Sequence, residues 1–385
     1  MNFKIYKIVY CIPALYSSGG VERVVSVKAS CFAEQYGYDV TIIVTEGNGK
    51  PPYFPLSERV KVINLGLDFE ELWHRPFFRK VFLYLKKQRA YKKLLKAELL
   101  RIRPDITVSV LRREINFITK IKDGSKKIGE LHVNRANYRN FEVNETNFIK
   151  RLFAKFWMRN LIGHLKELDQ FVVLTESECH VWPELSNICV IPDPLCIQRK
   201  ECSTLSKKRV ISIGRYAYQK GVDLLLKAWA IIEKDYPDWE LSYYGQGDRE
   251  PFLQLSKELN LDLGRCHLND KTTNVQQELL DSSVFVLTSR FEGFGMVIIE
   301  AMACGLPVVS FDCKSGPSEI ISDGKDGFLV PVGNVDVLAD KMSVLMNNQE
   351  MRAQFGKKAY KHSFRYDIDD IAKQWVQLFD KLVGR

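Results

Sequence analysis

The residues of this chain best suited to chemistry lie in the segment SRFEGFGMVIIEAMACGLPVV, at positions 289–309. Glu292 follows a short apolar run, and Glu300 comes eight residues later inside the apolar run MVIIEAMA, which we expect to be helical. A carboxylate is costly to bury without partners, and ribose hydroxyls would be suitable partners. Gly293 and Gly295 would free the backbone N–H groups at the helix start for a phosphate or a sugar. The alternative, an acidic first turn with one Glu reaching the surface, explains Glu292 but not Glu300.

A second candidate is the loop GRYAYQKG at 214–221, directly after the apolar run 209–213. Arg215 offers a planar fork of donors and Lys220 a point charge, a pair suited to a diphosphate. A hydrogen bond to a charged group contributes roughly 1.5–3 kcal/mol, so two such residues could neutralise most of a leaving diphosphate. Two solvated loop charges are the alternative, which fits either residue alone better than both between flanking glycines.

A third candidate is the glycine pair Gly19 and Gly20 in SSGGVERVV, which opens a helical pattern directly after the apolar run 4–12. Two glycines let the backbone approach a ligand, and a helix N-terminus favours an anion. For a glycine pair taken alone, a tight turn without a ligand is the alternative.

These loops follow short apolar runs that alternate with longer helical patterns. The predicted strands are 4–12, 39–45, 60–65, 105–110, 126–131, 170–174 and 188–191 in the first half, and 209–213, 239–244, 265–268, 284–288, 307–310 and 327–330 in the second. Most are continuous Val, Ile and Leu runs, typical of parallel strands buried on both faces. The alternation predicts an α/β fold of βαβ units, whose ligands bind beyond the C-terminal ends of the strands.

The polar segment 192–208 carries two prolines and separates two α/β halves, so we place a domain boundary there. Residues 1–190 hold 31 Lys and Arg against 20 Asp and Glu, a surplus of 11, whereas the remainder holds 25 against 27. The basic charge is concentrated in two stretches with interleaved aromatics, 75–103 and 148–166. Basic amphipathic helices of this kind favour an anionic membrane surface, although a solvated face over a core-packed stripe has the same spacing.

The order of these motifs resembles glycosyltransferase family 4, the group 1 glycosyl transferases, which are retaining enzymes of the GT-B fold. The resemblance rests on the spacing of Glu292 and Glu300 in EGFGMVIIEAMACGLPVV, with GGVERVV, GRYAYQKG, SGPSEII (315–321) and DGKDGFLVP (323–331) in the expected order. It covers essentially the whole chain and is strongest over 210–335. It implies two Rossmann-like domains, 1–192 and 209–362, with parallel sheets facing across a cleft and a tail helix over 366–385 packed back on the first domain.

The resemblance also implies a role for each candidate residue. Arg215 and Lys220 would bind the donor diphosphate, and Glu300 the ribose. Glu292, with the amides of Phe294 and Gly295, would hold the donor sugar. The remaining assignments are His132, after the strand 126–131, near the donor sugar; Gly19 and Gly20 on the phosphates; and Leu268, Asn274 and Val275 at the base. A buried structural role is the alternative for His132, and Asp193-Pro194 departs from the Asn-Pro that is common in the family.

The predicted activity is therefore retaining sugar transfer from a nucleotide-sugar, with uridine as the expected base, to a saccharide or polyprenyl-diphosphate-linked acceptor in bacterial surface polysaccharide biosynthesis. The resemblance implies front-face attack, in which the protein mainly stabilises the leaving group. We expect no metal or cofactor, because the sequence shows no metal-ligand cluster. The one D-x-D, at 367–369, opens the tail helix and is typical of a helix start.

Other GT-B chemistry, such as a nucleotide-sugar epimerase, and a non-catalytic sugar-nucleotide-binding protein remain alternatives. No recognisable nucleic-acid-binding module is present, so we expect no nucleic-acid partner. A dinucleotide oxidoreductase is disfavoured because GQGDRE has Glu250 at the position of the third glycine of that fingerprint. Nine scattered cysteines read as buried reduced thiols, and no apolar run is long enough to span a bilayer. We expect a cytoplasmic protein, peripheral on the inner membrane.

Overall fold

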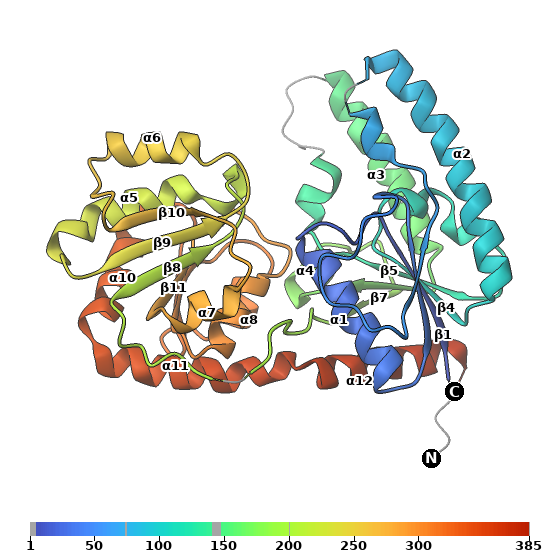
Figure 1. The fold of residues 1–385 in the computed structure, drawn as a ribbon. Coiled ribbons are helices and arrows are strands. Elements are labelled where there is room, and N and C mark those ends of the chain that lie inside the picture. Colours follow the sequence, from blue (N-terminus) through green and yellow to red (C-terminus); the bar gives the residue numbers. More distant parts are fainter. Residues whose placement is uncertain (1–4, 74, 141–147, 200, 385) are drawn as a thin grey trace. The chain divides into compact units, whose positions relative to one another are not determined.

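The computed structural model describes residues 5–73, 75–140, 148–199 and 201–384, with side chains 77, 139–140 and 148–154 outside the description. The chain divides into two compact units (Figure 1). The first unit comprises Met1–Cys196 together with Ile368–Arg385, and the second comprises Ile197–Asp367. The division falls within the polar segment 192–208, where proline and polar residues interrupt the apolar patterns.

The first unit is built on a seven-stranded sheet in the order β3-β2-β1-β4-β5-β6-β7, in which neighbouring strands run parallel. Its strands are β1 Lys7–Ile12, β2 Asp39–Val44, β3 Lys61–Asn64, β4 Ile106–Ser109, β5 Lys126–Glu130, β6 Gln170–Val173 and β7 Ile188–Val190. The central strands are buried along nearly their whole length, as their continuous apolar runs predict.

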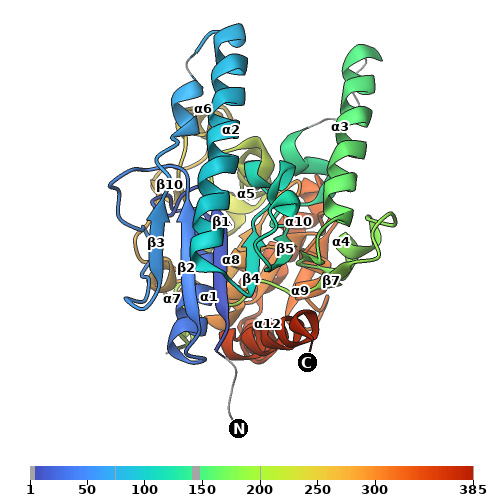
Figure 2. The same cartoon turned by 90° about the vertical axis from the view of Figure 1, so that its right-hand side faces the viewer.

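Helices cover both faces of this sheet (Figures 1 and 2). The α-helices are α1 Gly20–Glu34, α2 Phe77–Ile102, α3 Phe148–Lys166, α4 Glu176–His180 and α12 Ile368–Val383, and the short 3-10 helices are Phe69–Leu72, Arg113–Asn116, Ile118–Lys120 and Arg135–Asn140. One core joins α1 and α12 to the sheet, and the other joins α2 and α3 to the opposite face. The tail helix α12 thus packs on the first unit with Ile371, Trp375 and Phe379 fully buried.

The second unit contains a six-stranded parallel sheet in the order β10-β9-β8-β11-β12-β13. Its strands are β8 Arg209–Ile213, β9 Glu240–Gly245, β10 Cys266–Asp270, β11 Val284–Leu287, β12 Val308–Phe311 and β13 Gly327–Val330. Its α-helices are α5 Val222–Ile232, α6 Glu250–Glu258, α7 Val275–Leu280, α8 Met296–Ala303, α9 Pro317–Ile320, α10 Val335–Asn347 and α11 Gln349–Ser363, with 3-10 helices Tyr218–Lys220, Glu233–Asp235 and Phe364–Tyr366. Each predicted strand is present, with ends shifted by a few residues at most.

Local sequence sets where several of these helices begin. Asn274, Asn334 and Asn348 each accept a hydrogen bond from the backbone N–H three residues on, which caps α7, α10 and α11. The nine cysteines are free, but Cys202 is exposed, so the expectation that the thiols are buried is wrong for it. Among the described residues, no helix combines the length and apolar character needed to cross a membrane.

Candidate functional site

In the second unit, the loop after β8 presents Arg215 and Lys220 at the C-terminal edge of the sheet. Arg215 is exposed, and its Nη2 donates to Gln219 Oε1 at 3.0 Å. Its carbonyl accepts from the Tyr243 hydroxyl at 3.1 Å, which fixes the backbone of this loop against β9. The Arg215 guanidinium is thus exposed to water, while the Tyr243 hydroxyl holds the backbone of its loop.

Lys220 contacts the loop after the neighbouring strand β11. Its Nζ lies 2.5 Å from Glu292 Oε1, and the Ser289 hydroxyl donates to the same oxygen at 2.6 Å. The Lys220 and Glu292 side chains are only 15% and 7% exposed. Since β8 and β11 are adjacent in the sheet, two motifs about seventy residues apart in the sequence form one charged pair.

The backbones of these two loops are also tied together. Thr288 Oγ1 donates to the Lys220 carbonyl at 3.0 Å, and Gly221 has a φ of +60°. A Cβ at Gly221 would lie 2.1 Å from the Thr288 carbonyl oxygen, so only glycine permits this approach. Arg290 makes a bidentate ion pair with Asp223 on α5, at 2.9 and 2.7 Å, which anchors the second loop further.

Helix α8 begins at the end of this second loop. Gly295 occupies its N-cap position with a φ of +107°, and Phe294 is buried with its ring 5.6 Å from that of Tyr366. Gly316, in the motif SGPSEII, lies against Phe294: a Cβ added to Gly316 would be 1.7 Å from the Phe294 carbonyl oxygen. This motif therefore packs directly on the N-terminus of α8. Glu300 is buried on α8 and has 2% of its surface exposed, as its place in an apolar helix predicts.

The residues expected at the base lie at the far edge of the same sheet. Leu268 is buried on β10, two strands from β8. Asn274 is exposed and caps α7, and Val275 is the first residue of that helix. The structure thus places these three near a strand end, but the Asn274 Oδ1 is already used by the helix cap.

In the first unit, the glycine pair opens α1 directly after β1, as expected. Gly19 is the N-cap, and the Arg23 N–H donates to its carbonyl at 3.2 Å. The Glu22 carboxylate folds over Gly19, where an added Cβ would lie 2.2 Å from Glu22 Oε2, whereas nothing lies within 4 Å of a Cβ on Gly20. Of the two, Gly20 offers the open approach.

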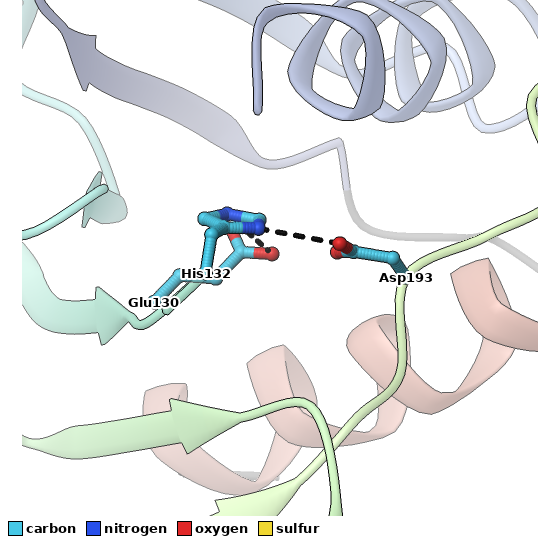
Figure 3. A group of neighbouring side chains, drawn as sticks. All are labelled: Glu130, His132 and Asp193. Atoms are coloured by element: carbon cyan, nitrogen blue, oxygen red, sulfur yellow. Dashed lines mark hydrogen bonds and ion pairs between the residues drawn. The ribbon is translucent and has the colours of Figure 1, made fainter. Parts of the chain in front are cut away.

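His132 lies two residues past the end of β5 and is enclosed by carboxylates (Figure 3). Its Nδ1 is 3.3 Å from Asp193 Oδ2, its Nε2 is 3.5 Å from Glu130 Oε1, and its side chain is 5% exposed. Burial alone would lower the pKa of His132, but Asp193 and Glu130 outweigh this effect and raise the pKa to about 9. The two carboxylates therefore favour the protonated form of the ring.

A third charged group completes this cluster. The Lys28 ammonium, from α1, pairs with Glu130 Oε1, and both side chains are 1% exposed. Burial would raise the pKa of Glu130, yet Lys28 and His132 lower it to about 2. Glu130, His132 and Asp193 offer three atoms within 4.8 Å of one another, a spacing that a metal ion could bridge. Because Lys28 already supplies the positive charge at Glu130, we interpret the cluster as balanced by ammonium and proton, not as a set of metal ligands.

Sequence reasoning found the motif residues but missed those that hold them. Ser289 and Tyr243 support the second-unit loops, and Lys28, Glu130 and Asp193 surround His132. One signal was available for Lys28, which lies on the same helical face as Val24, Val25 and Phe32, where a charge is unexpected. Asp193 gave no such signal, since it stands in a polar segment.

Residues 197–362 match the family described as Glycosyl transferases group 1. An uncharacterized glycosyltransferase of Haemophilus influenzae is 29% identical over 96% of this chain and 98% of the relative. The amylovoran biosynthesis glycosyltransferase AmsD of Erwinia amylovora is 25% identical over 97% of this chain and 100% of the relative.

Among solved structures, a mutant of Staphylococcus aureus TarM in complex with Fondaparinux, alpha-GlcNAc-glycerol and UDP aligns with a TM-score of 0.76. The sequences are 19% identical, and the alignment covers 98% of this chain and 100% of that chain. At this identity the likeness concerns the fold alone.

Proposed function

Because the chain is a group 1 glycosyltransferase with the GT-B fold, we propose that it transfers a sugar with retention from a UDP-sugar. The acceptor we propose is a saccharide, free or carried on a polyprenyl diphosphate, in bacterial polysaccharide biosynthesis. The amylovoran biosynthesis relative supports the polysaccharide assignment, and the UDP in the TarM complex supports the base.

The observation that carries this proposal is the Lys220–Glu292 contact between neighbouring strand ends. A diphosphate leaving group develops negative charge as its bond to the sugar breaks, and fixed cations at that point lower the barrier. Lys220 is held by a carboxylate and two anchored loops, so its ammonium is positioned before substrate arrives. The exposed guanidinium of Arg215 supplies a second cation on the same loop.

In the proposed front-face reaction, the bond between the anomeric carbon and the diphosphate oxygen breaks with its electron pair moving to that oxygen. The same diphosphate accepts the proton of the acceptor hydroxyl, and the hydroxyl oxygen bonds to the anomeric carbon on the face that the leaving group left. The protein's task is then to hold charge: Arg215 and Lys220 at the diphosphate, Glu300 at the ribose, and Glu292 with the Phe294 and Gly295 amides at the sugar.

We also propose that the reaction needs no metal or cofactor, because two side-chain cations serve the leaving group. The Asp367 carboxylate of the one D-x-D is paired with Arg199, so it has a structural partner. Full activity in excess EDTA is the expected result, and a strict requirement for manganese or magnesium would contradict this proposal.

The basic helices favour a location on the cytoplasmic face of the membrane. Exposed apolar side chains line the first turns of α2 at Phe78, Val81, Phe82 and Leu85, with exposed fractions of 87%, 42%, 70% and 51%. Their spacing places them on one face of the helix, and exposed Arg79, Lys86 and Arg89 lie beside them. On α3, Phe156 is 71% exposed between Lys155 and Arg159, while residues 148–154 of this stretch lie outside the described side chains.

The N-terminal ends of α2 and α3 reach beyond the sheet at the same end of the first unit (Figure 2). Because both helices follow parallel strands, this is the edge at which those strands end. Apolar side chains ringed by cations would bind an anionic bilayer. A lipid-linked acceptor would then reach the protein on the same side as His132.

Replacing Phe82 and Leu85 together with Ser tests this surface. We expect the double variant to lose at least about tenfold in co-sedimentation with anionic liposomes at physiological salt, with an unchanged melting temperature because both side chains are largely in water. Ile231→Ser, at a 49% exposed apolar site on α5, is the matched control and should bind like wild type. Failure of the wild-type protein to bind such liposomes would contradict the membrane proposal.

The activity itself is tested by nucleotide release from UDP-, GDP- and ADP-sugars, with and without a prenyl-diphosphate sugar acceptor. Release from one UDP-sugar that requires the acceptor, and that vanishes in Lys220→Ala, Glu300→Ala, is the expected result. Conversion of the donor to an isomer without acceptor would indicate an epimerase instead. Saturable nucleotide binding without any release would indicate a sugar-nucleotide-binding protein.

A further inference from the structure

The first unit encloses four ionisable side chains that come from separate parts of the chain. Lys28 lies on α1, Glu130 ends β5, His132 follows it, and Asp193 follows β7. Lys28 pairs with Glu130, whose Oε1 is 3.5 Å from His132 Nε2, and Asp193 Oδ2 is 3.3 Å from His132 Nδ1 (Figure 3). The four side chains are between 1% and 5% exposed, so water screens these charges little.

The balance of charge in this cluster depends on one proton. With a neutral imidazole, one ammonium faces two carboxylates, and the buried cluster carries a net negative charge. With an imidazolium, two cations face two anions. A buried unpaired charge is costly, so the cluster favours the proton on His132.

Among the described residues, the ion-pair partners of the His132 ring are Asp193 and Glu130. Asp193 and Glu130 have the largest electrostatic effects on the ring, and Lys28 is paired with Glu130. On β1, Tyr10 lies under the Lys28 ammonium at 5.9 Å, and burial raises the pKa of its hydroxyl well above the usual value, so it stays neutral. On α12, the Trp375 ring lies 4.4 Å from the same ammonium.

Within the cluster, Asp193 has fewer side-chain partners than Glu130. Glu130 pairs with Lys28 as well as His132, whereas His132 is the one side chain among the described residues that pairs with Asp193. Asp193 lies three residues before the end of the first unit, where the Arg23 guanidinium donates to the Cys196 carbonyl at 3.1 Å. The segment that carries Asp193 is therefore fixed, and its carboxylate is held beside the ring.

We propose that Asp193 is a positioning residue that, with Glu130, keeps His132 as an imidazolium, so that His132 serves the transfer as a fixed cation and not as a proton acceptor. This proposal rests on the proposed function, in which His132 lies near the donor sugar. Both ring nitrogens of an imidazolium carry hydrogen, so neither can take the proton of an acceptor hydroxyl. The reaction must then pass that proton to another base, such as the leaving diphosphate.

The test compares wild type with Asp193→Asn, which keeps the shape of the side chain and removes its charge. The six imidazoles are titrated by NMR from about pH 5 to about pH 10, and the signal absent from His132→Gln identifies His132. In wild type we expect its midpoint near 9. In Asp193→Asn we expect it to fall by roughly one to three pH units. Asp169→Asn, which removes a carboxylate paired with Lys126 at 3.0 Å, is the matched control and should leave it in place.

The pH profile of transfer gives a second readout that a merely structural role would not move. We expect the kcat of Asp193→Asn to stay within about twofold of wild type near pH 6 and to fall about threefold or more near pH 8.5, with little change in KM. A His132 midpoint at or below 6.5 in wild type, or one that Asp193→Asn leaves unchanged, would overturn the proposal. So would one equivalent of Mn²⁺ or Zn²⁺ that displaces the proton from His132 at neutral pH.

Failure of the proposed function can be distinguished from failure of this inference. If no donor is turned over by any of these proteins, the transferase assignment and the catalytic part of the inference both fall. If wild type is active and its His132 titrates near neutrality, only the inference falls. If Asp193→Asn does not fold, the wild-type titration still tests whether His132 is an imidazolium at neutral pH, and a midpoint at or below 6.5 overturns the proposal.

Discussion

At the scale of single residues, Lys220 and Glu292 of the second unit form an ion pair. Neither Lys220 nor Glu292 is fully exposed, and each would be costly to bury without the other. The pair keeps the ammonium desolvated and fixed in direction, and a phosphate arriving there would find it already oriented. Ser289, which shares the same carboxylate oxygen, limits the positions that Glu292 can adopt.

Replacing Lys220 with Ala should lower kcat about 100-fold or more, because a fixed cation at the leaving group acts mainly in the transition state. The measurement is steady-state nucleotide release with the preferred donor. Lys257→Ala, at an exposed lysine on α6, is the control and should behave like wild type. A rise in KM with kcat unchanged would contradict a role at the leaving group.

A second prediction at this scale concerns Glu130 and how the unfolding free energy changes at acidic pH. Its pKa in the folded protein, about 2, is lower than its ordinary value, so its contribution is present above about pH 4.5 and is lost as the pH falls towards 2. Glu130→Gln should cost about 3–5 kcal/mol of unfolding free energy at pH 7, because Lys28 would remain buried without its partner.

The measurement is urea unfolding of Glu130→Gln and wild type between about pH 3 and about pH 7. The difference between the two proteins should shrink as the pH falls. Glu34→Gln, at an exposed position of α1, is the control. A difference that does not vary with pH would show that the charge of Glu130 is not what stabilises the first unit.

At the scale of elements, the site is made by loops that follow adjacent parallel strands. The loops after β8 and β11 touch because their strands pair, and the Gly221–Thr288 approach brings their backbones together. Helix α8 then begins at Gly295, where SGPSEII packs on its entrance. The chemistry-bearing side chains depend on these backbone contacts for their position.

Substituting Gly221 with Ala should separate the two loops. The substitution adds a left-handed backbone penalty of roughly 1–2 kcal/mol, and a Cβ would also lie 2.1 Å from the Thr288 carbonyl oxygen. Gly324→Ala is the matched control, because Gly324 has a φ of +68° but nothing within 4 Å of its added Cβ.

We expect Gly221→Ala to lower the melting temperature clearly more than Gly324→Ala, by about 2–4 °C for each additional kcal/mol. It should also weaken UDP binding, measured by calorimetry, at least about tenfold, since Lys220 is the neighbouring residue. Equal effects of the two substitutions would show that the Thr288 contact does not hold the loop.

At the scale of the whole molecule, the chain returns to its first unit after completing the second. Helix α12 follows the last residue of the second unit and buries one apolar face against α1. Trp375 is fully buried there, and the Lys28 ammonium lies over its ring. The end of the chain thus contributes to the environment of the charged cluster around His132.

Trp375→Ala should reduce the unfolding free energy of the first unit by about 3–5 kcal/mol, the usual cost of deleting a buried Trp side chain. Urea unfolding followed by circular dichroism provides the measurement. Gln377→Ala, on the exposed side of the same helix, should change it by less than about 0.5 kcal/mol. A small effect of Trp375→Ala would mean that the tail helix is not needed to complete the core.

The sequence by itself determined the strands, the loops after them and the charged residues of the motifs. Continuous apolar runs marked the strands, glycines marked the loops behind them, and the charges of Arg215, Lys220, Glu292 and Glu300 stood out against their local surroundings. These features are readable because each depends on a few neighbouring residues. The exposed apolar face of α2 could not be predicted in this way, because helical spacing alone does not distinguish a buried face from an exposed one. The tertiary structure shows that Leu95 is buried and Phe82 is exposed.

The tertiary structure decided which residues from distant segments come into contact. The order of strands in the second sheet set Lys220 against Glu292, and the first unit gathered Lys28, Glu130, His132 and Asp193 from positions spread over much of its length. The charge on His132 follows from that gathering, because two carboxylates from distant segments outweigh the effect of burial. Local pattern fixes what a residue can do chemically, whereas contact between distant segments fixes its protonation and its partners.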